Sequence, residues 1–481
     1  MPTEEHRAGI TLKTSVKSVD LHFPSGGTSD APLSPRASKI RSELRDSLKI
    51  PSGFVAGAGH QPIVWHAGIL AKFVAASSVA DAHGPSGQWI HFLSDQDVID
   101  PFRIDLPARD RNGSVRRSSL RLTLENSHIS SNAVPFARPA QSAIHLGNEA
   151  IASPAASAVL DQVIAAINRA SDAPNAGVQM ARAMLHCANR WVNPPTAIVE
   201  SRSLLMCDAA REILQKIFAA PEECAVHFNA ALKFDSRAAR PLRENGLRSE
   251  VPVWGVREDG CRERIDAVEA QRRFDRGLPL LPRAFLASGL MRLTCDLFFH
   301  GTGGVRYERV GERWWRDFLD VQLPDFGSAT ATIIPLPSDL GLNFDPHTLP
   351  LATWREAWWD PTRLDRAHDS HSMIEPTRAA LLQRIADAPR KSRERRAAYR
   401  ALCDHINSLR QRHSTELASL ELTETKGKAL RTQRALANDR TWPFGLMRES
   451  SVDLMATAIR DQIPQGEITT ATRSLPQKPR G

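Results

Sequence analysis

The chain has 481 residues, of which 42% are hydrophobic and 24% are charged, so it is long enough for two or three compact units with a sizeable core. The formal net charge is +8, but the basic residues are spread along the chain without a block of five like charges, which argues against a nucleic-acid partner. No run of about eighteen apolar residues predicts a membrane span, and the N-terminus lacks a secretory signal. We therefore expect a soluble cytoplasmic protein with no membrane partner.

Residues 1–45 are rich in Ser, Pro, Gly and Thr, which predicts a mobile N-terminal segment. A strand is expected at 53–57, then a turn, an apolar helix over 69–76 and a second strand at 89–93. This order is typical of a parallel α/β sheet, in which ligands bind beyond the carboxyl ends of the strands.

An α/β core with inserted connecting segments is expected to span residues 46–375. Its further predicted elements are a strand at 118–125, two helices within 155–190, a helix at 208–219, a hairpin turning at Glu258-Asp259-Gly260, and two helices within 281–318 that flank a glycine-rich turn. We expect the hairpin to cover an edge of the sheet.

Residues 376–440 lose aromatic residues and gain Arg, Glu, Gln and Ala, which predicts a helical arm. Tyr399, Leu402, Ile406 and Leu409 step by three and four, as in the seam of a coiled coil. A returning helix is indicated by Leu417, Leu420 and Leu430, so an antiparallel coiled coil joined near 410–415 is expected. The tail 441–481 begins with aromatic residues and is expected to pack partly on the core.

The first candidate site is the glycine-rich segment 57–68 with Lys72 one turn into the following helix. Glycines let backbone N–H groups approach a ligand, and a helix N-terminus attracts anions. His60, His66 and Lys72 could neutralise charge on a phosphate or carboxylate, while Gly59, Gln61 and Gly68 could contact substrate. The alternative is that the two histidines cap the helix or satisfy each other.

The second candidate site is Ser94-Asp95-Gln96-Asp97, directly after the strand at 89–93. A carboxylate at a strand end can orient an amine or accept its proton. Asp95 and Asp97 lie two residues apart and point to opposite sides of a continuing strand, so at most one faces a pocket. The alternative is a solvated helix cap.

The third candidate site is the glycine-rich turn after His300, with Gly303, Gly304 and Tyr307. A phenol beside such a turn suits hydrogen bonding to a polar ligand, and Arg283 at the start of the preceding helix is a candidate carboxylate clamp. The alternative is a helix C-cap followed by a buried aromatic residue.

Several common classes of site are absent from the sequence. The six cysteines form no CxxC pair, which argues against a zinc ribbon, a redox centre or a disulfide framework, and we predict free thiols and no metal site. No GxxxxGK[ST], GxSxG or HExxH motif and no kinase motif set occurs, so P-loop and common hydrolase functions have no support.

In their order along the chain, the three segments resemble the cysteine-adding enzyme of bacillithiol biosynthesis and its relatives. The stretch Trp89 to Asp97 is similar to that family's W-I-x-x-E-D-H-D motif, with Gln96 in place of His. Pro282-Arg283 and the turn up to Tyr307 resemble its Arg-Pro segment and its G-G-P-G-E-x-x-Y turn, without the Glu. His66-Ala67-Gly68-Ile69 looks like an HxGH element with Ile69 in place of the second His.

The resemblance implies a Rossmann-like, nucleotidylyltransferase-like core and a coiled-coil arm that can support a homodimer. It also implies a ligase that forms an amide between a carboxyl-bearing metabolite and an amino-sugar-like amine. The sequence does not identify a cofactor, and ATP is the candidate. In this interpretation His60, His66 and Lys72 stabilise negative charge, Asp97 positions or deprotonates the amine, and Arg283 and Tyr307 hold the substrate. Two alternatives remain: a nucleotidylyltransferase or synthetase-like enzyme acting on another metabolite, and a non-catalytic coiled-coil scaffold.

Overall fold

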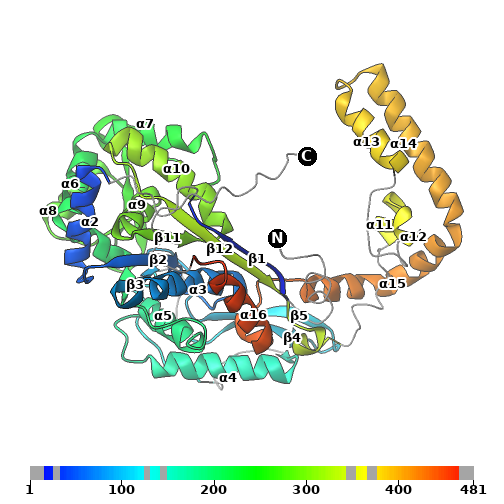
Figure 1. Ribbon diagram of the computed structural model, residues 1–481, viewed down its shortest axis with the longest axis horizontal. Coiled ribbons are helices and arrows are strands. Elements are labelled where there is room, and N and C mark those ends of the chain that lie inside the picture. Colours follow the sequence, from blue (N-terminus) through cyan, green and yellow to red (C-terminus); the bar gives the residue numbers. More distant parts are fainter. Residues whose placement is uncertain are drawn as a thin grey trace.

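The computed structural model describes residues 16–24, 33–123, 130–140, 149–342, 354–365 and 376–464, with 422–431 described by their backbone alone. The fold is mixed α/β around a six-stranded, mainly parallel sheet (Figure 1). In spatial order its strands are β1 (Val16–His22), β12 (Phe326–Ile333), β11 (Leu297–His300), β2 (Phe54–His60), β3 (Gly87–Leu93) and β7 (Ala197–Glu200). All neighbours pair in parallel except β1, which runs antiparallel to β12.

The central strands are apolar on both faces because helices cover both sides of the sheet. On β11, Leu297 and Phe299 belong to one buried hydrophobic cluster and Phe298 to the other. Ala56 and Val55 divide in the same way on β2. This period-two alternation gives the protein a core on each side of the sheet.

One core is completed by helices α3 (Ala67–Ala82), α4 (Pro154–Arg169), α5 (Ala176–Cys187) and α16 (Glu449–Arg460). The other is completed by α2 (Pro35–Ser47), α6 (Asp208–Ala219), α7 (Pro221–Leu232), α8 (Ala267–Asp275), α9 (Phe285–Thr294) and α10 (Thr302–Leu319). The predicted pair of helices within 155–190 and the helix at 208–219 are confirmed as α4, α5 and α6.

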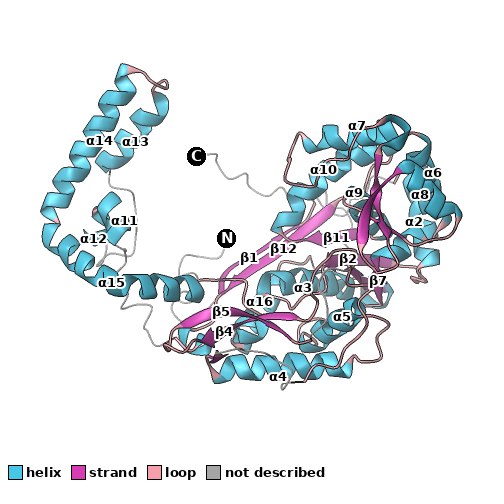
Figure 2. Cartoon of the chain, turned by 180° about the vertical axis from the view of Figure 1, so that it is seen from behind, coloured by secondary structure: helices cyan, strands magenta, loops and turns pink. Residues whose placement is uncertain are grey.

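Two three-stranded antiparallel sheets flank the central one (Figure 2). One contains β4 (Arg103–Arg109), β5 (Val115–Arg121) and β6 (Ala150–Ile151), and the other β8 (Glu250–Val256), β9 (Arg262–Asp266) and β10 (Leu280–Pro282). The predicted hairpin is confirmed as β8–β9, with Gly260 at φ +77° in its turn. The strand predicted at 118–125 begins three residues earlier, and its last two residues lie outside the described part of the chain.

The arm differs from the predicted arrangement of its helices. α13 (Pro376–Asp387) and α14 (Arg393–Arg412) form the helical hairpin, with their turn at 388–392, and Leu381 packs there against Leu402 and Ile406. α15 (Ser414–Ala437) follows α14 end to end after the single residue His413, and Figure 1 shows the two as one bent rod. The junction of two helices predicted near 410–415 is therefore confirmed at His413, but the predicted antiparallel return at this point is wrong.

Residues of the predicted seam also lie differently. Tyr399 is 58% exposed, whereas the preceding residue, Ala398, is buried. Leu417 packs against Ala357 of α11 (Trp354–Trp359), which α12 (Thr362–Asp365) follows. The side chain of Leu430 lies outside the described residues.

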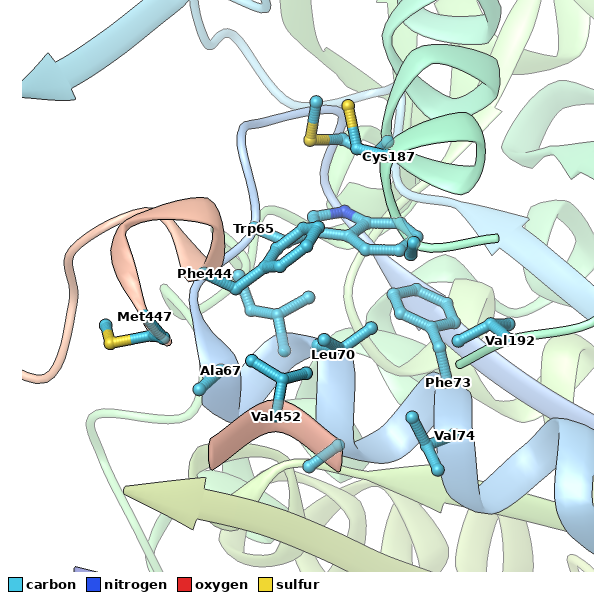
Figure 3. Packing of buried hydrophobic residues seen from close by; sticks show 14 of the residues in the cluster. Trp65, Ala67, Leu70, Phe73, Val74, Cys187, Val192, Phe444, Met447 and Val452 are labelled. Atoms are coloured by element: carbon cyan, nitrogen blue, oxygen red, sulfur yellow. The ribbon is translucent and has the colours of Figure 1, made fainter. Parts of the chain in front are cut away.

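Both ends of the described chain return to the body. The segment 441–464 packs on α3, where Phe444, Met447 and Val452 join Trp65 and Leu70 (Figure 3). At the other end, β1 and α2 lie within residues 1–45, so the prediction of a mobile segment is wrong for 16–22 and 35–45. The rest of the two terminal predictions lies outside the described part of the chain. This concerns residues 1–15 and 25–32 of the N-terminal segment and residues 465–481 of the tail.

Candidate functional site

A cavity of about 830 Å³ lies where the order of the central strands reverses, between β2 and β11. Connections from these two strands lead in opposite directions along the sheet, which leaves a crevice at their carboxyl ends. The cavity is lined by residues at or just beyond the ends of three strands: Gly59, His60 and Gln61 for β2, Ser94, Gln96 and Asp97 for β3, and His300, Gly303 and Gly304 for β11. Arg283 and Tyr307 complete the set, so all three candidate segments meet here.

Asp97 is held at the mouth of this cavity by two donors. Gln61 Nε2 donates to Asp97 Oδ2 at 2.6 Å, and Arg262 Nη1 donates to Oδ1 at 2.9 Å. The Asp97 side chain is 32% exposed. This places an oriented carboxylate within reach of a bound ligand, where it can accept a proton or a hydrogen bond.

Three arginines give the cavity a basic wall. Arg283 is buried, donates to Glu250 and to the carbonyl of Arg240, and lies 4.5 Å from the centre of the Trp254 ring. Arg262 lies at the same distance from that ring. Glu250, which also accepts from Arg264, is not part of the lining, whereas Arg240, Arg262 and Arg283 are. The arrangement suits a planar anion such as a carboxylate or phosphate.

Two helices point their N-termini at the same space. The first turns of α9 and α10 contribute Ala287, Ser288, Gly303 and Gly304 to the lining, and neither helix has a side-chain cap or an acidic residue in its first turn. Their positive dipole ends are therefore open to an anionic ligand. Ala284, directly before α9, has φ +50°, a region that a residue with a Cβ rarely adopts.

The cavity histidines are neutral at pH 7. Burial, together with the charge of Lys72, lowers the pKa of His60 and of His300 well below the ordinary value. The His60 ring is therefore suited to act as a neutral hydrogen-bonding group. Its Nδ1 lies 3.1 Å from the carbonyl of Gln61.

A buried acid lies beside His300. Glu308 Oε2 accepts from Arg292 Nη1 at 3.0 Å, and both side chains are fully buried. Glu308 Oε1 lies 3.2 Å from His300 Nε2 without hydrogen-bond geometry, so these two atoms have no partner within the described residues. Burial raises the pKa of Glu308. Because Glu308 and His300 line the cavity, a ligand can supply the missing hydrogen bonds.

The phenol of Tyr307 reaches the same part of the cavity. Its ring packs 5.1 Å from that of Phe285, and burial raises its pKa well above the ordinary value, with Glu308 and Asp97 adding to the effect. Tyr307 is therefore a neutral donor. Gly304 is required beside it, because a Cβ there would lie 2.5 Å from His300 Nδ1.

His66 lies outside the cavity lining and caps α3. Its Nδ1 accepts from the backbone N–H of Gly68 at 3.1 Å, the helix-cap alternative considered above. Burial and nearby Arg440 and Lys72 lower the pKa of His66 to about 4, so the ring is a neutral acceptor at pH 7. Gly68 is likewise outside the lining, with its backbone engaged in the cap.

Replacing His66 by alanine is expected to lower the free energy of unfolding by about 1 kcal/mol, the usual cost of losing an N-cap acceptor. Ligand binding should be unaffected. His66→Asn, which keeps a capping acceptor, serves as the matched control and should recover most of the loss in chemical denaturation. An alanine variant of unchanged stability that no longer binds ligand would contradict this structural role.

Lys72 lies beneath the cavity floor and not in its lining. Its Nζ donates to the carbonyl of Gly59, and its side chain is buried without a carboxylate partner among the described residues. Burial lowers the pKa of Lys72 to about 7. The lysine thus supports the β2 end from below and does not contact a ligand in the cavity directly.

This buried lysine predicts a pH-dependent stability. In the folded protein it gives up its proton near pH 7, whereas the unfolded chain holds that proton up to about pH 10.5. Stability should therefore rise with pH across this window, since the unfolded state binds more protons there. Urea denaturation at pH 6.5 and 9 should show a smaller rise for Lys72→Met than for wild type. The exposed control Lys17→Met should behave like wild type, and an equal rise in all three proteins would contradict the assignment.

Asp95 also lies outside the cavity. Its Oδ1 accepts from the backbone N–H of Ser201 at 2.9 Å and from the Ser201 hydroxyl, and burial raises its pKa to about 6. Asp95 and Asp97 therefore face different surroundings, in agreement with the prediction that at most one of them faces a pocket. Asp95 joins β3 to the segment after β7.

Four residues of the cavity were not predicted from the sequence: Glu308, Arg262, Trp254 and Arg240. His300 marked only the start of the third candidate segment. Glu308 had a usable signal, since it is a charged residue on the face of α10 that carries Trp315 and Gly311. Arg262 and Trp254 come from the β8–β9 hairpin, which builds one wall of the cavity and does not cover an edge of the central sheet. Nothing in the local sequence indicates that position.

Comparison with known proteins adds no family assignment: no protein-family model matches the chain, and the curated proteins contain no significant match. Within the described ranges, no three His, Cys, Asp or Glu side chains gather as a metal site. In those same ranges, no helix has the length and apolar character needed to cross a bilayer.

Proposed function

We propose that this protein is a ligase-type enzyme that joins a carboxyl-bearing metabolite to an amino-sugar-like amine, as its resemblance to the cysteine-adding enzyme of bacillithiol biosynthesis implies. One observation carries the proposal. Three segments that lie between Gly59 and Tyr307 in the sequence, each carrying polar groups, converge on a single cavity at the carboxyl ends of β2, β3 and β11.

The strand order supports a Rossmann-like core. In chain order the parallel strands are β2, β3, β7, β11 and β12, which we count as the first to the fifth. Across the sheet, starting from β7, they lie in the order third, second, first, fourth, fifth. This is the order of a mononucleotide-binding half extended by two strands, and its ligands bind at the point of reversal. The cavity lies at that point.

The two sides of the cavity suggest different tasks. Arg262, Arg283 and the open N-termini of α9 and α10 would hold the carboxylate or phosphate of one substrate. Asp97 would orient the amine and take its proton as the new carbon–nitrogen bond forms and the group leaving the carboxyl carbon departs with its electron pair. ATP is the candidate source of that leaving group, with its phosphates on the basic wall.

A nucleotidylyltransferase-like enzyme acting on another metabolite is the second candidate, because the same strand order supports it. A scaffold with a decayed pocket is less consistent with the structure, since the cavity keeps an oriented Asp97 and the unpartnered atoms of His300 and Glu308. The coiled-coil character of the arm, dimerisation through it and a cytoplasmic location are further parts of the proposal.

Product analysis separates these candidates. The purified full-length protein would be incubated with ATP, cysteine and amino-sugar derivatives of malate, and the products identified by mass spectrometry. An amide product supports the ligase proposal, and a nucleotide-linked product supports the second candidate. If no covalent product forms with any combination while the same ligands bind, the ligase proposal is wrong.

A further inference from the structure

The end of the arm carries an uncompensated positive charge. We call residues 384–400 the arm tip; it contains the end of α13, the turn and the start of α14. Seven of its residues are Arg or Lys and two are Asp or Glu, so it holds +5 of the net charge of +8. The exposed basic residues are Arg384, Arg390, Lys391, Arg393, Arg396 and Arg400.

Ion pairs do not neutralise the charge of the arm tip within the described residues. None of the six forms an ion pair with a carboxylate in the described part of the chain, in contrast to the body, where Arg273 pairs with both Glu263 and Glu269. Two arginines of the tip donate to backbone carbonyls. Arg395 Nη1 donates to those of Ile385 and Ala388 and closes the end of α13, and Arg396 Nη1 donates to that of Lys391 at 3.0 Å. Like charges placed close together repel each other and destabilise the folded state. A cluster of unpaired cations therefore points to an external polyanion that neutralises it.

The tip also offers an aromatic surface. Tyr399 is 58% exposed and lines a shallow cavity of about 580 Å³ together with Lys391, Arg396 and Arg400. A phenol face flanked by cations is the arrangement on which a nucleic-acid base stacks while its phosphates meet the basic side chains. The positive end of α14, a helix of 20 residues, adds to the attraction.

We propose that the arm tip binds single-stranded nucleic acid. An anionic membrane fits less well, because an interfacial helix needs an exposed apolar face, whereas Ala398, Leu402 and Ile406 of α14 are buried in the arm. An acidic protein would use the charge but would leave the Tyr399 face unexplained. The charge was not apparent as a block in the sequence, because Ser392 and Glu394 interrupt it and the turn brings Arg384 close to it.

The test measures binding of a fluorescent, unstructured 20-nucleotide RNA to the full-length chain by anisotropy between 50 and 200 mM KCl. Replacing Arg393, Arg396 and Arg400 by Gln should weaken binding at least tenfold at 50 mM. It should also reduce the slope of log affinity against log salt by about 2, since each phosphate contact on a single strand contributes about 0.7. Tyr399→Ala should weaken binding at least fivefold, and Tyr399→Phe should bind like wild type.

The control replaces Arg169, Arg276 and Arg448, three exposed arginines of the body, by Gln, which removes the same charge. It should bind within twofold of wild type. Equal weakening in both triple variants would overturn the proposal, because general charge would then explain binding. Absence of RNA binding would also overturn it, as would tip-dependent binding of phosphatidylserine vesicles or of a polyglutamate peptide with no RNA binding. The result is independent of the proposed ligase activity, because the tip lies at the far end of the arm from the sheet whose strand ends form the cavity (Figure 1).

Discussion

Replacing Arg292 by methionine is expected to lower the free energy of unfolding by about 3–5 kcal/mol, the usual cost of leaving a buried charge without its partner. Arg292 and Glu308 are both fully buried, and their side chains meet at 3.0 Å. Arg292 also donates to Glu312 at 2.8 Å and to the carbonyl of Pro324. Its loss therefore removes three hydrogen bonds and leaves the buried Glu308 carboxylate without its charged partner.

Urea denaturation at pH 7 measures this loss of stability. Two further variants show whether the loss comes from the unpaired Glu308 carboxylate or from breaking any ion pair. Arg292→Met combined with Glu308→Leu should be more stable than Arg292→Met alone, because no unpaired carboxylate remains. Arg257→Met, which breaks the exposed pair with Asp259, should change stability by no more than about 0.5 kcal/mol. A loss of less than 1 kcal/mol for Arg292→Met would contradict the role given to this pair.

Replacing Asp97 by asparagine is expected to lower kcat/KM for the proposed amide-forming reaction about 10²–10⁴-fold, the range lost with a general base. Asparagine keeps the size of the side chain and one acceptor oxygen, but it loses the charge and the ability to take a proton. The melting temperature should change little, since the ion pair with Arg262 is partly exposed.

Asp95→Asn is the matched control, because it is the same change two residues away in a side chain outside the cavity. It should keep kcat/KM within about threefold of wild type. Measuring kcat and KM separately distinguishes catalysis from binding. A rise in KM with unchanged kcat would show that Asp97 only positions Arg262. Full activity in Asp97→Asn, or an equal loss in both variants, would contradict the assignment of Asp97.

The sequence predicted the elements whose pattern is local and strong. The helices α4, α5 and α6, the hairpin β8–β9 and the opening strand, helix and strand of the sheet were all expected. Four strands of the central sheet, β1, β7, β11 and β12, were missed, and β11 lies within the range 281–318 that was predicted as two helices and a turn. Each of them pairs with at least one strand that is distant along the chain. The turn of the arm was assigned to the wrong pair of helices. The heptad pattern predicts where helices form, but it does not predict which helices pack against each other.

All three predicted segments meet at the cavity, but several of the individual residues chosen within them do not line it. Glycine-rich turns and strand ends identified Gly59, Asp97, Arg283 and Tyr307 before any tertiary information. His66 and Lys72 have the residue types of a catalytic group, but only the packing shows that one caps α3 and the other supports β2 from below. The basic wall depends on the position of a hairpin that no local pattern reveals.

The central claim is that the cavity between β2 and β11 is the working binding site for an anionic small molecule. A thermal-shift panel with ATP, ADP, cysteine, malate and amino-sugar derivatives tests it on wild type, Arg262→Gln and Arg257→Gln. Both arginines belong to the hairpin region of β8 and β9, but only Arg262 lines the cavity. A ligand at 100 times its Kd stabilises a protein by about 2.7 kcal/mol. We predict a shift that persists in Arg257→Gln and is lost in Arg262→Gln; an equal shift in both variants, or no shift with any ligand in the folded protein, would contradict the claim.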